Sequence, residues 1–348
     1  MSKNSTVIPA LFKVLYLMRG KGNAVPPEME AAVEELNAVA YETGRKLFML
    51  NAFEDAQLYL NVAAAAGYDW HLFALATCGV YRDGIGYSQD GKIFSHASDE
   101  TKKWLTLAAA VDYVPALIQL GDAKSKTRAK ELLDAGAVRG PLATYYMYLL
   151  TDDSNYLQQA ATEGSSLAKF KLAQLYRRVP QMIENAALRT AKIEELFQDS
   201  ADAGLPLAVY ARVFDAESTA SAAEKQTRLA QLAWLGQVEG MLEYGYALAN
   251  MPRTQNPTPG RHQDGQQIPH TYGLARDLGV AHAMLKFVLK NTAGAIQIRN
   301  LATDIHLIEM RMSDADVGTS NGTLRQLAEK KVEPFYRLEE LIIPGTAR

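Results

Sequence analysis

The chain has 348 residues, of which 48% are hydrophobic and 22% are charged, and its formal net charge is −3 at pH 7. This composition is typical of a soluble globular protein, and the slight negative charge offers no basic surface for nucleic acid. A single cysteine, Cys78, excludes an internal disulfide framework, and no Cys/His spacing indicates a structural zinc site. The neighbours of Cys78 indicate a helix, so we interpret it as a small buried residue rather than a nucleophile.

Residues 1–50 are expected to form capping helices at the N-terminal end of the fold. Residues 7–18 are apolar except for Lys13, but they are too few to span a bilayer and no A-x-A-like cleavage site follows them. We interpret this segment as an amphipathic helix and expect a cytoplasmic protein. The alternative is a degenerate or trimmed secretory signal, which would make the protein periplasmic. Beyond a break at Pro26 and Pro27, helical spacing of apolar residues predicts a long helix over residues 31–50.

Residues 51–250 repeat one short pattern, which is clearest between Asn155 and Tyr176. An aromatic residue is followed four residues later by two alanines, then by Gly164 and Ala168. We predict two helices joined at the glycine, because small residues allow close helix approach and glycine accepts the left-handed conformation that ends a helix. Gly164 and its equivalent Gly204 are therefore expected to have positive φ. The predicted turn residues of the six copies are Gly67, Asp112, Gly140, Gly164, Gly204 and Gly236.

The recurrence of this unit predicts an all-α protein without β-sheet. Its helical hairpins are expected to stack into an α-solenoid that curves as a superhelix, each hairpin burying its apolar face against its neighbours. Spacing within a copy is fixed, whereas successive turn residues are separated by 24 residues (140 to 164) up to 45 residues (67 to 112). Repeats joined by loops of variable length fit this pattern, and a globular enzyme core does not.

One loop sequence supports a family resemblance. Residues 81–90, YRDGIGYSQD, resemble the Y-x-x-G-x-G-V-x-x-D loop of the Sel1-like repeats, which are relatives of the tetratricopeptide repeat, although Tyr87 replaces the usual valine. Trp104 and the pair Ala108–Ala109 follow, as in that family. The resemblance extends over residues 51–248. It implies a repeat array that mediates assembly with other proteins.

Two local motifs could indicate other chemistry, but their contexts argue against it. In the run DGIGYSQDG, Ile85 and Tyr87 stand where an EF-hand needs carboxylates for calcium. Ser166 and Lys169 match the S-x-x-K motif of some acyl-transfer enzymes, but they begin a repeat helix and the companion motifs are absent. No nucleotide-binding, hydrolase or zinc-protease motif occurs in the sequence. We predict no catalytic residue, no cofactor and no metal site, and a protein that is not an enzyme.

Residues 251–273 depart most from the repeat pattern. Four prolines and two glycines within residues 251–272 predict an exposed loop that leaves the stack. His262, Asp264 and His270 could approach a metal, but a solvated loop is the favoured interpretation because no helix fixes them. Contact with a partner protein is more plausible, since long loops on rigid scaffolds often carry function.

Residues 274–348 are expected to return to helix and to close the array. Apolar spacing predicts helices over 278–289 and 296–312, the latter with a stripe that includes Leu301, Ile305 and Ile308. We expect a break from Ser313 to Gly322, and then a last helix over 324–343 that Pro334 kinks.

A surface for a partner is predicted on the second helix of each hairpin. The residue six positions past the turn residue points about 140° from the centre of the signature face, since each helical residue turns by about 100°. This position is apolar in successive copies, and aromatic in three of them. Two alternatives remain: the face packs on the neighbouring repeat, or it lines an exposed groove with aromatic anchors. The candidate partner-binding residues on this face and in the loop are Tyr146, Phe170, Lys171, Gln174, Tyr210, Phe214, Glu243, Tyr246, Arg261 and His262.

Three functions from different classes follow. The first is a scaffold or adaptor that binds a partner protein, which the Sel1-like resemblance favours. The second is a bacterial immunity protein that neutralises a cognate secreted toxin, for example a phospholipase effector. The third, ranked last, is an enzyme with a noncanonical site.

Overall fold

The computed structural model describes residues 30–49, 53–65, 69–82, 98–215, 217–251, 272–292 and 301–329. Within these ranges the regular structure is helical and contains no strand, which confirms the all-α prediction. The chain divides into two compact units, whose described parts lie within residues 30–169 and 170–329. The expected helix over 7–18, the turn at Gly67, the loop after Gly84, the candidates Arg261 and His262 and the kink at Pro334 lie outside the described residues.

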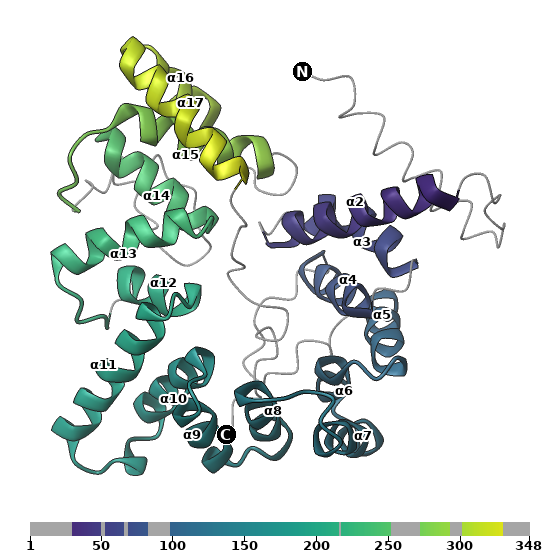
Figure 1. Ribbon diagram of the computed structural model, residues 1–348. Coiled ribbons are helices and arrows are strands. Elements are labelled where there is room, and N and C mark those ends of the chain that lie inside the picture. Colours follow the sequence, from purple (N-terminus) through teal and green to yellow (C-terminus); the bar gives the residue numbers. More distant parts are fainter. Residues whose placement is uncertain are drawn as a thin grey trace. The chain divides into compact units, whose positions relative to one another are not determined.

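The first unit is a succession of helices, each packed on the next (Figure 1). Its core combines small and aliphatic side chains, for example Leu60, Ala63, Leu105 and Ala108, with the fully buried rings of Phe73, Tyr145 and Tyr146. Cys78 is buried among them, as its sequence context predicted. The helices are α2 (Glu30–Met49), α3 (Phe53–Ala65), α4 (Asp69–Arg82), α5 (Asp99–Ala110), α6 (Val114–Leu120), α7 (Ala123–Asp134), α8 (Pro141–Thr151) and α9 (Ser154–Thr162).

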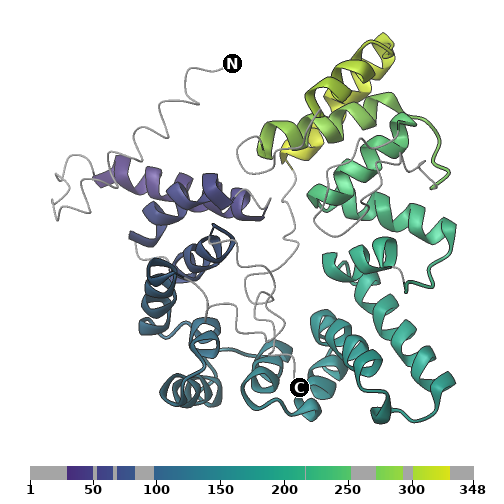
Figure 2. The same ribbon diagram turned by 180° about the vertical axis from the view of Figure 1, so that it is seen from behind.

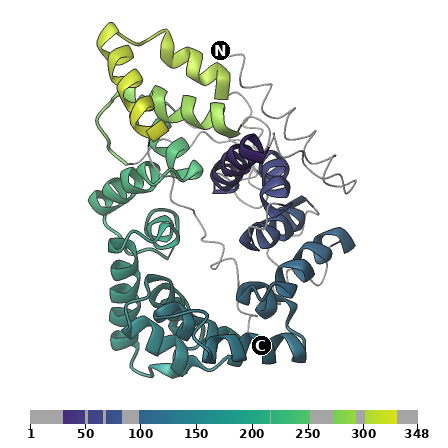
Figure 3. The same ribbon diagram turned by 45° about the vertical axis from the view of Figure 1, so that its right-hand side comes forward.

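The second unit contains α10 from Phe170 onward and the helices that follow it. Figure 1 shows α10, α12 and α14 in one row and α11 and α13 in another, and Figure 2 shows the same rows from behind. The elements are α10 (Ser166–Arg178), a 3-10 turn (Pro180–Met182), α11 (Ala186–Asp202), α12 (Pro206–Phe214), α13 (Ala222–Trp234), α14 (Val238–Ala249), α15 (Leu278–Thr292), α16 (Leu301–Glu309) and α17 (Asp314–Glu329). The last two helices both pack on α15, and Figure 3 shows these three as one group.

The hairpin turns have the geometry that the glycine pattern predicted. Gly164 and Gly204 have φ of 100° and 77°, which confirms their left-handed conformation. In each turn the next residue's amide donates to a carbonyl five residues back, from Ser165 to Ala160 (3.0 Å) and from Leu205 to Ser200 (3.1 Å). These are Schellman motifs, which satisfy the last carbonyls of a helix and reverse the chain within a few residues.

The third repeat copy is displaced from the predicted register. Its Schellman turn lies at Gly136, where φ is 76° and the Ala137 amide donates to the Leu132 carbonyl at 2.9 Å. Gly140 also has positive φ, but it is the N-cap of α8 and does not end α7. Leu132 and Leu133 take the place of the small pair in this copy. The assignment of Gly140 as the hairpin turn was therefore wrong by four residues.

The break predicted from Ser313 to Gly322 is also wrong, because most of this segment forms the first half of α17. Ser313 and Asp316 form a capping box, in which the Ser313 amide donates to the Asp316 carboxylate (2.8 Å) and the Asp316 amide donates to Ser313 Oγ (3.3 Å). Ser320 and Thr323 are buried one helical turn apart. The cap and the buried face outweigh the low helix propensity of the glycines. In α16, the expected apolar stripe is confirmed, since Leu301, Ile305 and Ile308 are buried.

Candidate functional site

Helix α12 presents an apolar stripe that its neighbours do not fully cover. It begins with Pro206, which is favourable in the first turn of a helix because no intrahelical bond is lost there. Leu207, Tyr210 and Phe214 follow at i, i+3 and i+7 and remain half-buried, and the rings of Tyr210 and Phe214 lie 4.6 Å apart between centroids. This spacing places the three side chains on one side of the helix.

The equivalent sides of α10 and α14 carry charge. Counted from the N-caps Ser165 and Leu205, Gln174 of α10 corresponds to Phe214 of α12, both nine residues on. Lys171 is half-buried and Gln174 and Arg178 are exposed, whereas on α14 Glu239 and Glu243 are half-buried. We call this surface the second-helix face; its members are Lys171, Gln174 and Arg178 of α10, Leu207, Tyr210 and Phe214 of α12, and Glu239 and Glu243 of α14.

Five predicted site residues lie on this face, and three others are buried. Phe170 packs edge-on against Phe197 with ring centroids 5.4 Å apart, and Arg177 lies over the same Phe197 ring at 4.4 Å. Tyr246 donates a hydrogen bond to Asp304 (2.7 Å) inside the unit. Tyr146 is 1% exposed. These three residues therefore follow the alternative in which the face packs inside the array, and they do not line an exposed groove.

In the third copy, the residue of α8 that is equivalent to Phe170 of α10 differs by one position from the predicted one. Its N-cap is Gly140, so Tyr145, and not Tyr146, stands five residues past the cap, as Phe170 does past Ser165. Both tyrosines are buried. The predicted column therefore does not continue into α8 as an exposed surface.

Sequence reasoning missed Arg178, Leu207 and Glu239 as members of the face. The spacing to predicted members could have indicated them, since Arg178 follows Gln174 by four residues and Leu207 precedes Tyr210 by three. Glu239 likewise precedes Glu243 by four residues. Side chains at these separations lie next to one another on a helix.

A buried ion-pair network fixes α12 between α11 and α13. The guanidinium of Arg212, with its side chain 8% exposed, donates to Glu194 at 2.5 Å and twice to Glu224, both at 2.9 Å. Burial alone would lower the pKa of Arg212, but hydrogen bonds to Glu224 and Glu194 raise it above its ordinary value. Planar guanidinium groups suit such multiple contacts, so the pairs orient α12 as well as neutralise charge.

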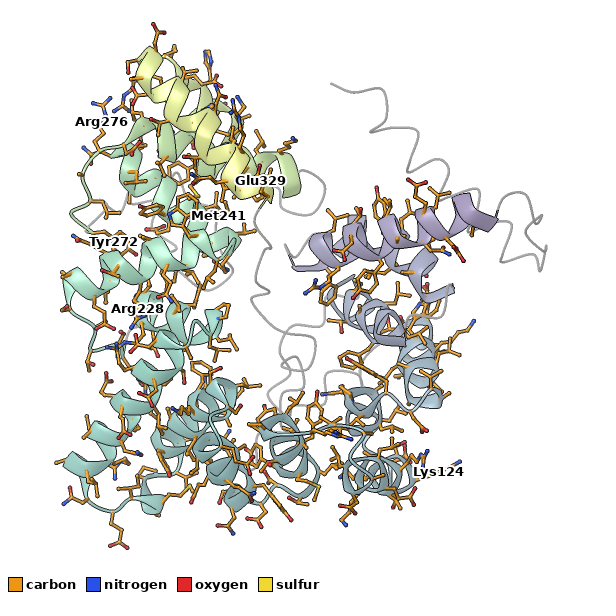
Figure 4. The ribbon with its side chains drawn as sticks, in the orientation of Figure 1. Lys124, Arg228, Met241, Tyr272, Arg276 and Glu329 are labelled. Carbon is orange, nitrogen blue, oxygen red and sulfur yellow. The ribbon has the colours of Figure 1, made fainter. Side chains whose placement is uncertain are left out.

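Further ion pairs join neighbouring hairpins of the second unit. Arg177 binds Asp215 at 2.8 Å, which links α10 to the end of α12. Arg228, labelled in Figure 4 on α13, pairs with Asp202 at the end of α11. Met241, also labelled there, is fully buried on α14. The two ion pairs therefore join α10 to α12 and α13 to α11.

The first unit contains an open cavity of about 780 Å³ among α5, α6 and α7. Lys124, labelled in Figure 4, and Leu117 are among its lining residues. Arg128 closes one side by two hydrogen bonds to Asp112, of 2.9 and 2.5 Å. These bonds hold the pKa of the Asp112 carboxyl below its usual value. Because both groups of this pair are exposed, solvent weakens it, and the cavity lacks the enclosed polar groups of a ligand site.

No group of three His, Cys, Asp or Glu side chains among the described residues is placed to hold a metal ion. In the same parts of the chain, none of the helices is both long enough and apolar enough to cross a membrane.

The repeated spacing of small residues and turn glycines, and the helical hairpins that they form, together define the fold. It is an all-α array of helical hairpins. No protein-family model matches the chain, and no curated protein matches it. A solved structure of a protective antigen present in uropathogenic Escherichia coli strains, described as having an SLR fold, is similar at 15% identity, with a TM-score of 0.36 and coverage of 92% of this chain and 76% of that one. A Sel1 repeat protein from Oxalobacter formigenes is similar at 19% identity, with a TM-score of 0.37 and coverage of 86% and 87%.

Proposed function

We propose that this protein is a scaffold that binds a partner protein on the second-helix face. The observation that carries the proposal is the half-buried stripe of Leu207, Tyr210 and Phe214 on α12. Aromatic side chains that are already partly ordered supply apolar contact area at low entropic cost, and they are frequent anchors of protein interfaces. Arg212 holds the opposite side of the same helix through three charged hydrogen bonds. A partner would therefore meet a preorganised surface.

In this proposal residues 51–250 form the binding array, residues 1–50 and 274–348 close its ends, and residues 251–273 offer a second contact through Arg261 and His262. No residue has a catalytic role. An immunity protein is a narrower form of the same proposal, in which the partner is a secreted toxin. The identity of the captured protein separates the immunity function from a general scaffold.

The test is capture of the partner from the native cells, followed by mass spectrometry and an affinity measurement. The variant combines Tyr210→Ala with Phe214→Ala, and the matched control is Leu188→Ala, an exposed apolar residue of α11 away from the face. We expect the double variant to lose at least ten-fold in affinity while the control binds normally. Equal affinity of the folded double variant and the control would contradict the proposal.

A further inference from the structure

Helix α17 has one buried side and one exposed side. The buried side packs on α15, where Ser320 Oγ lies 2.7 Å from His282 Nδ1. Figure 3 shows both helices in the group at the end of the second unit. Since each helical residue turns by about 100°, the exposed residues form a single stripe along the helix. We call it the α17 stripe; its members are Asp314, Val317, Gly318, Asn321, Gly322, Arg325 and Ala328.

Two glycines of the stripe are not required by any turn or packing contact in the described parts of the chain. Gly318 and Gly322 lie inside the helix, and a Cβ added at either would meet no atom within 4 Å. Gly279 of α15 differs, since a Cβ there would collide with Thr319. An exposed helical glycine lowers helix stability relative to alanine. The approach of a second backbone gives these two glycines a reason, because glycine has no side chain to hold it away.

The two ends of the stripe carry opposite charges. Asp314 stands in the first turn of α17, and Arg325 follows eleven residues later on the same side, about 16 Å along the axis. Neither side chain forms an ion pair with another described residue. Between them Val317 is 47% exposed, although it is a large apolar residue. The stripe is therefore complementary in charge to a second copy of itself that runs in the opposite direction.

We propose that the α17 stripe is the contact surface of a homodimer, in which the α17 helices of two copies pack antiparallel. The two-fold axis crosses the helix between residues 319 and 320, so Asp314 of each copy faces Arg325 of the other. Val317 then packs over Gly322 of the second copy. A two-fold contact uses the same patch on both copies. A parallel pair is disfavoured, since it would place Asp314 beside Asp314 and Arg325 beside Arg325.

The contact is small, so the dimer is expected to be weak. Stable protein interfaces bury at least about 1,200 Å² in total, and two stripes of this length bury less. Exposed charge pairs set orientation more than affinity, and salt screens them. We expect a dissociation constant on the order of 100 μM that rises with added salt. The inference does not depend on the second-helix face, because α17 contributes none of its residues.

The experiment is sedimentation equilibrium of the full chain in low salt, from about 10 μM to about 1 mM, a range that brackets the expected dissociation constant. We expect the weight-average mass to rise from the monomer value of 38.2 kDa toward twice that value. A monomer mass at every concentration would overturn the proposal. Growth beyond the dimer would overturn it as well, because a two-fold contact closes after two copies.

Charge reversal makes the test specific to the stripe. Asp314→Arg and Arg325→Asp, each alone, create two like-charge contacts and are expected to weaken the dimer at least about ten-fold. An equimolar mixture of the two single variants should dimerise again, because one copy is then basic at both ends of the stripe and the other is acidic at both. The double variant should dimerise as the unmodified protein does. Loss of the dimer without recovery in the mixture would overturn the proposal.

Two matched controls lie on α5 in the first unit. Asp99 follows the N-cap Ser98 in the first turn of α5, and Lys103 is an exposed basic residue of the same helix. We expect Asp99→Arg and Lys103→Asp to leave the dimer unchanged, and circular dichroism verifies that every variant is helical. Equal weakening by controls and stripe variants would overturn the proposal, as would a dimer that persists in both single stripe variants. Either failure leaves the scaffold function standing, since that is judged by partner capture.

Discussion

The phenol of Tyr246 donates a 2.7 Å hydrogen bond to the carboxylate of Asp304, although 58 residues separate them in the chain. Both side chains are buried, and they join α14 to α16. A buried carboxylate is costly unless hydrogen bonds compensate for its lost hydration. Tyr246 therefore stabilises the closing helices of the second unit.

Removing this hydroxyl should destabilise the fold. We expect Tyr246→Phe to lower the free energy of unfolding by about 1–3 kcal/mol, because Asp304 loses this donor inside the protein. Combining it with Asp304→Asn should cost less than the sum of the two single changes, as expected for contacting residues. Urea denaturation measures each value. Strict additivity of the two changes would show that the bond does not contribute to stability.

The hairpin turns give a second prediction. Gly204→Val should destabilise by about 1 kcal/mol or more, since a β-branched residue resists positive φ. An added Cβ would meet no atom within 4 Å, so the loss comes from the backbone alone. Gly204→Asn should therefore retain most of the stability, because asparagine tolerates the left-handed conformation. The same pair of changes at Gly164 should behave alike. Thermal unfolding in which asparagine and valine are equally harmful would contradict this explanation.

Two helical glycines should respond in opposite directions to alanine. At Gly279 an added Cβ would lie 2.6 Å from the Thr319 Cβ and 2.7 Å from the Asp316 carbonyl oxygen, so α15 and α17 would have to separate. At Gly318 nothing lies within 4 Å. We expect Gly279→Ala to lower the unfolding midpoint and Gly318→Ala to raise stability by about 0.5–1 kcal/mol. A destabilised Gly318→Ala variant would contradict the assignment of this residue to an open helical position.

The hairpins could be predicted because their turns depend on local chemistry. Gly164 and Gly204 sit where only glycine adopts the required φ without strain, and that requirement is visible in the spacing. Gly318 was interpreted as part of a break because glycine is also a helix breaker, and its role depends on Ser320 and Thr323 packing in the folded chain. That packing depends on contacts with other helices, which the local sequence does not show.

The exposed side of the second helices could be predicted only in part. Their opposite sides are both apolar, so spacing identified Phe170 and Tyr210 as equivalent without indicating which is covered. The structure distinguishes them, since Phe170 packs on Phe197 and Tyr210 is only half-buried. In the third copy, a displacement of the turn from Gly140 to Gly136 was enough to change the residue that takes this position. A helix turns by about 100° per residue, so small register errors reassign faces.

The ion-pair network predicts a loss of stability in acid. Burial raises the pKa of Glu194, but hydrogen bonds from Thr219 and Arg212 outweigh burial and hold it below the ordinary value of 4.5. A carboxyl group with a lowered folded-state pKa contributes stability that is complete above about pH 4.5 and is lost as pH falls through the folded-state pKa. We expect stability to fall less steeply below pH 4.5 in Glu194→Gln than in the unmodified protein. Denaturant titrations from pH 6 to about pH 3 compare the slopes; parallel curves would contradict the role of Glu194.

The central claim is that the second-helix face binds a partner protein, and one paired measurement tests it most directly. Affinity for the captured partner and the thermal midpoint are measured together for Tyr210→Ala combined with Phe214→Ala, and for Tyr146→Ala. Tyr146 is buried, so Tyr146→Ala should lower the free energy of unfolding by about 3 kcal/mol or more. Truncation of the half-buried Tyr210 and Phe214 should lower affinity for the partner at least ten-fold with only a modest change in the thermal midpoint. A folded double variant that binds the partner as tightly as the unmodified protein would contradict the account.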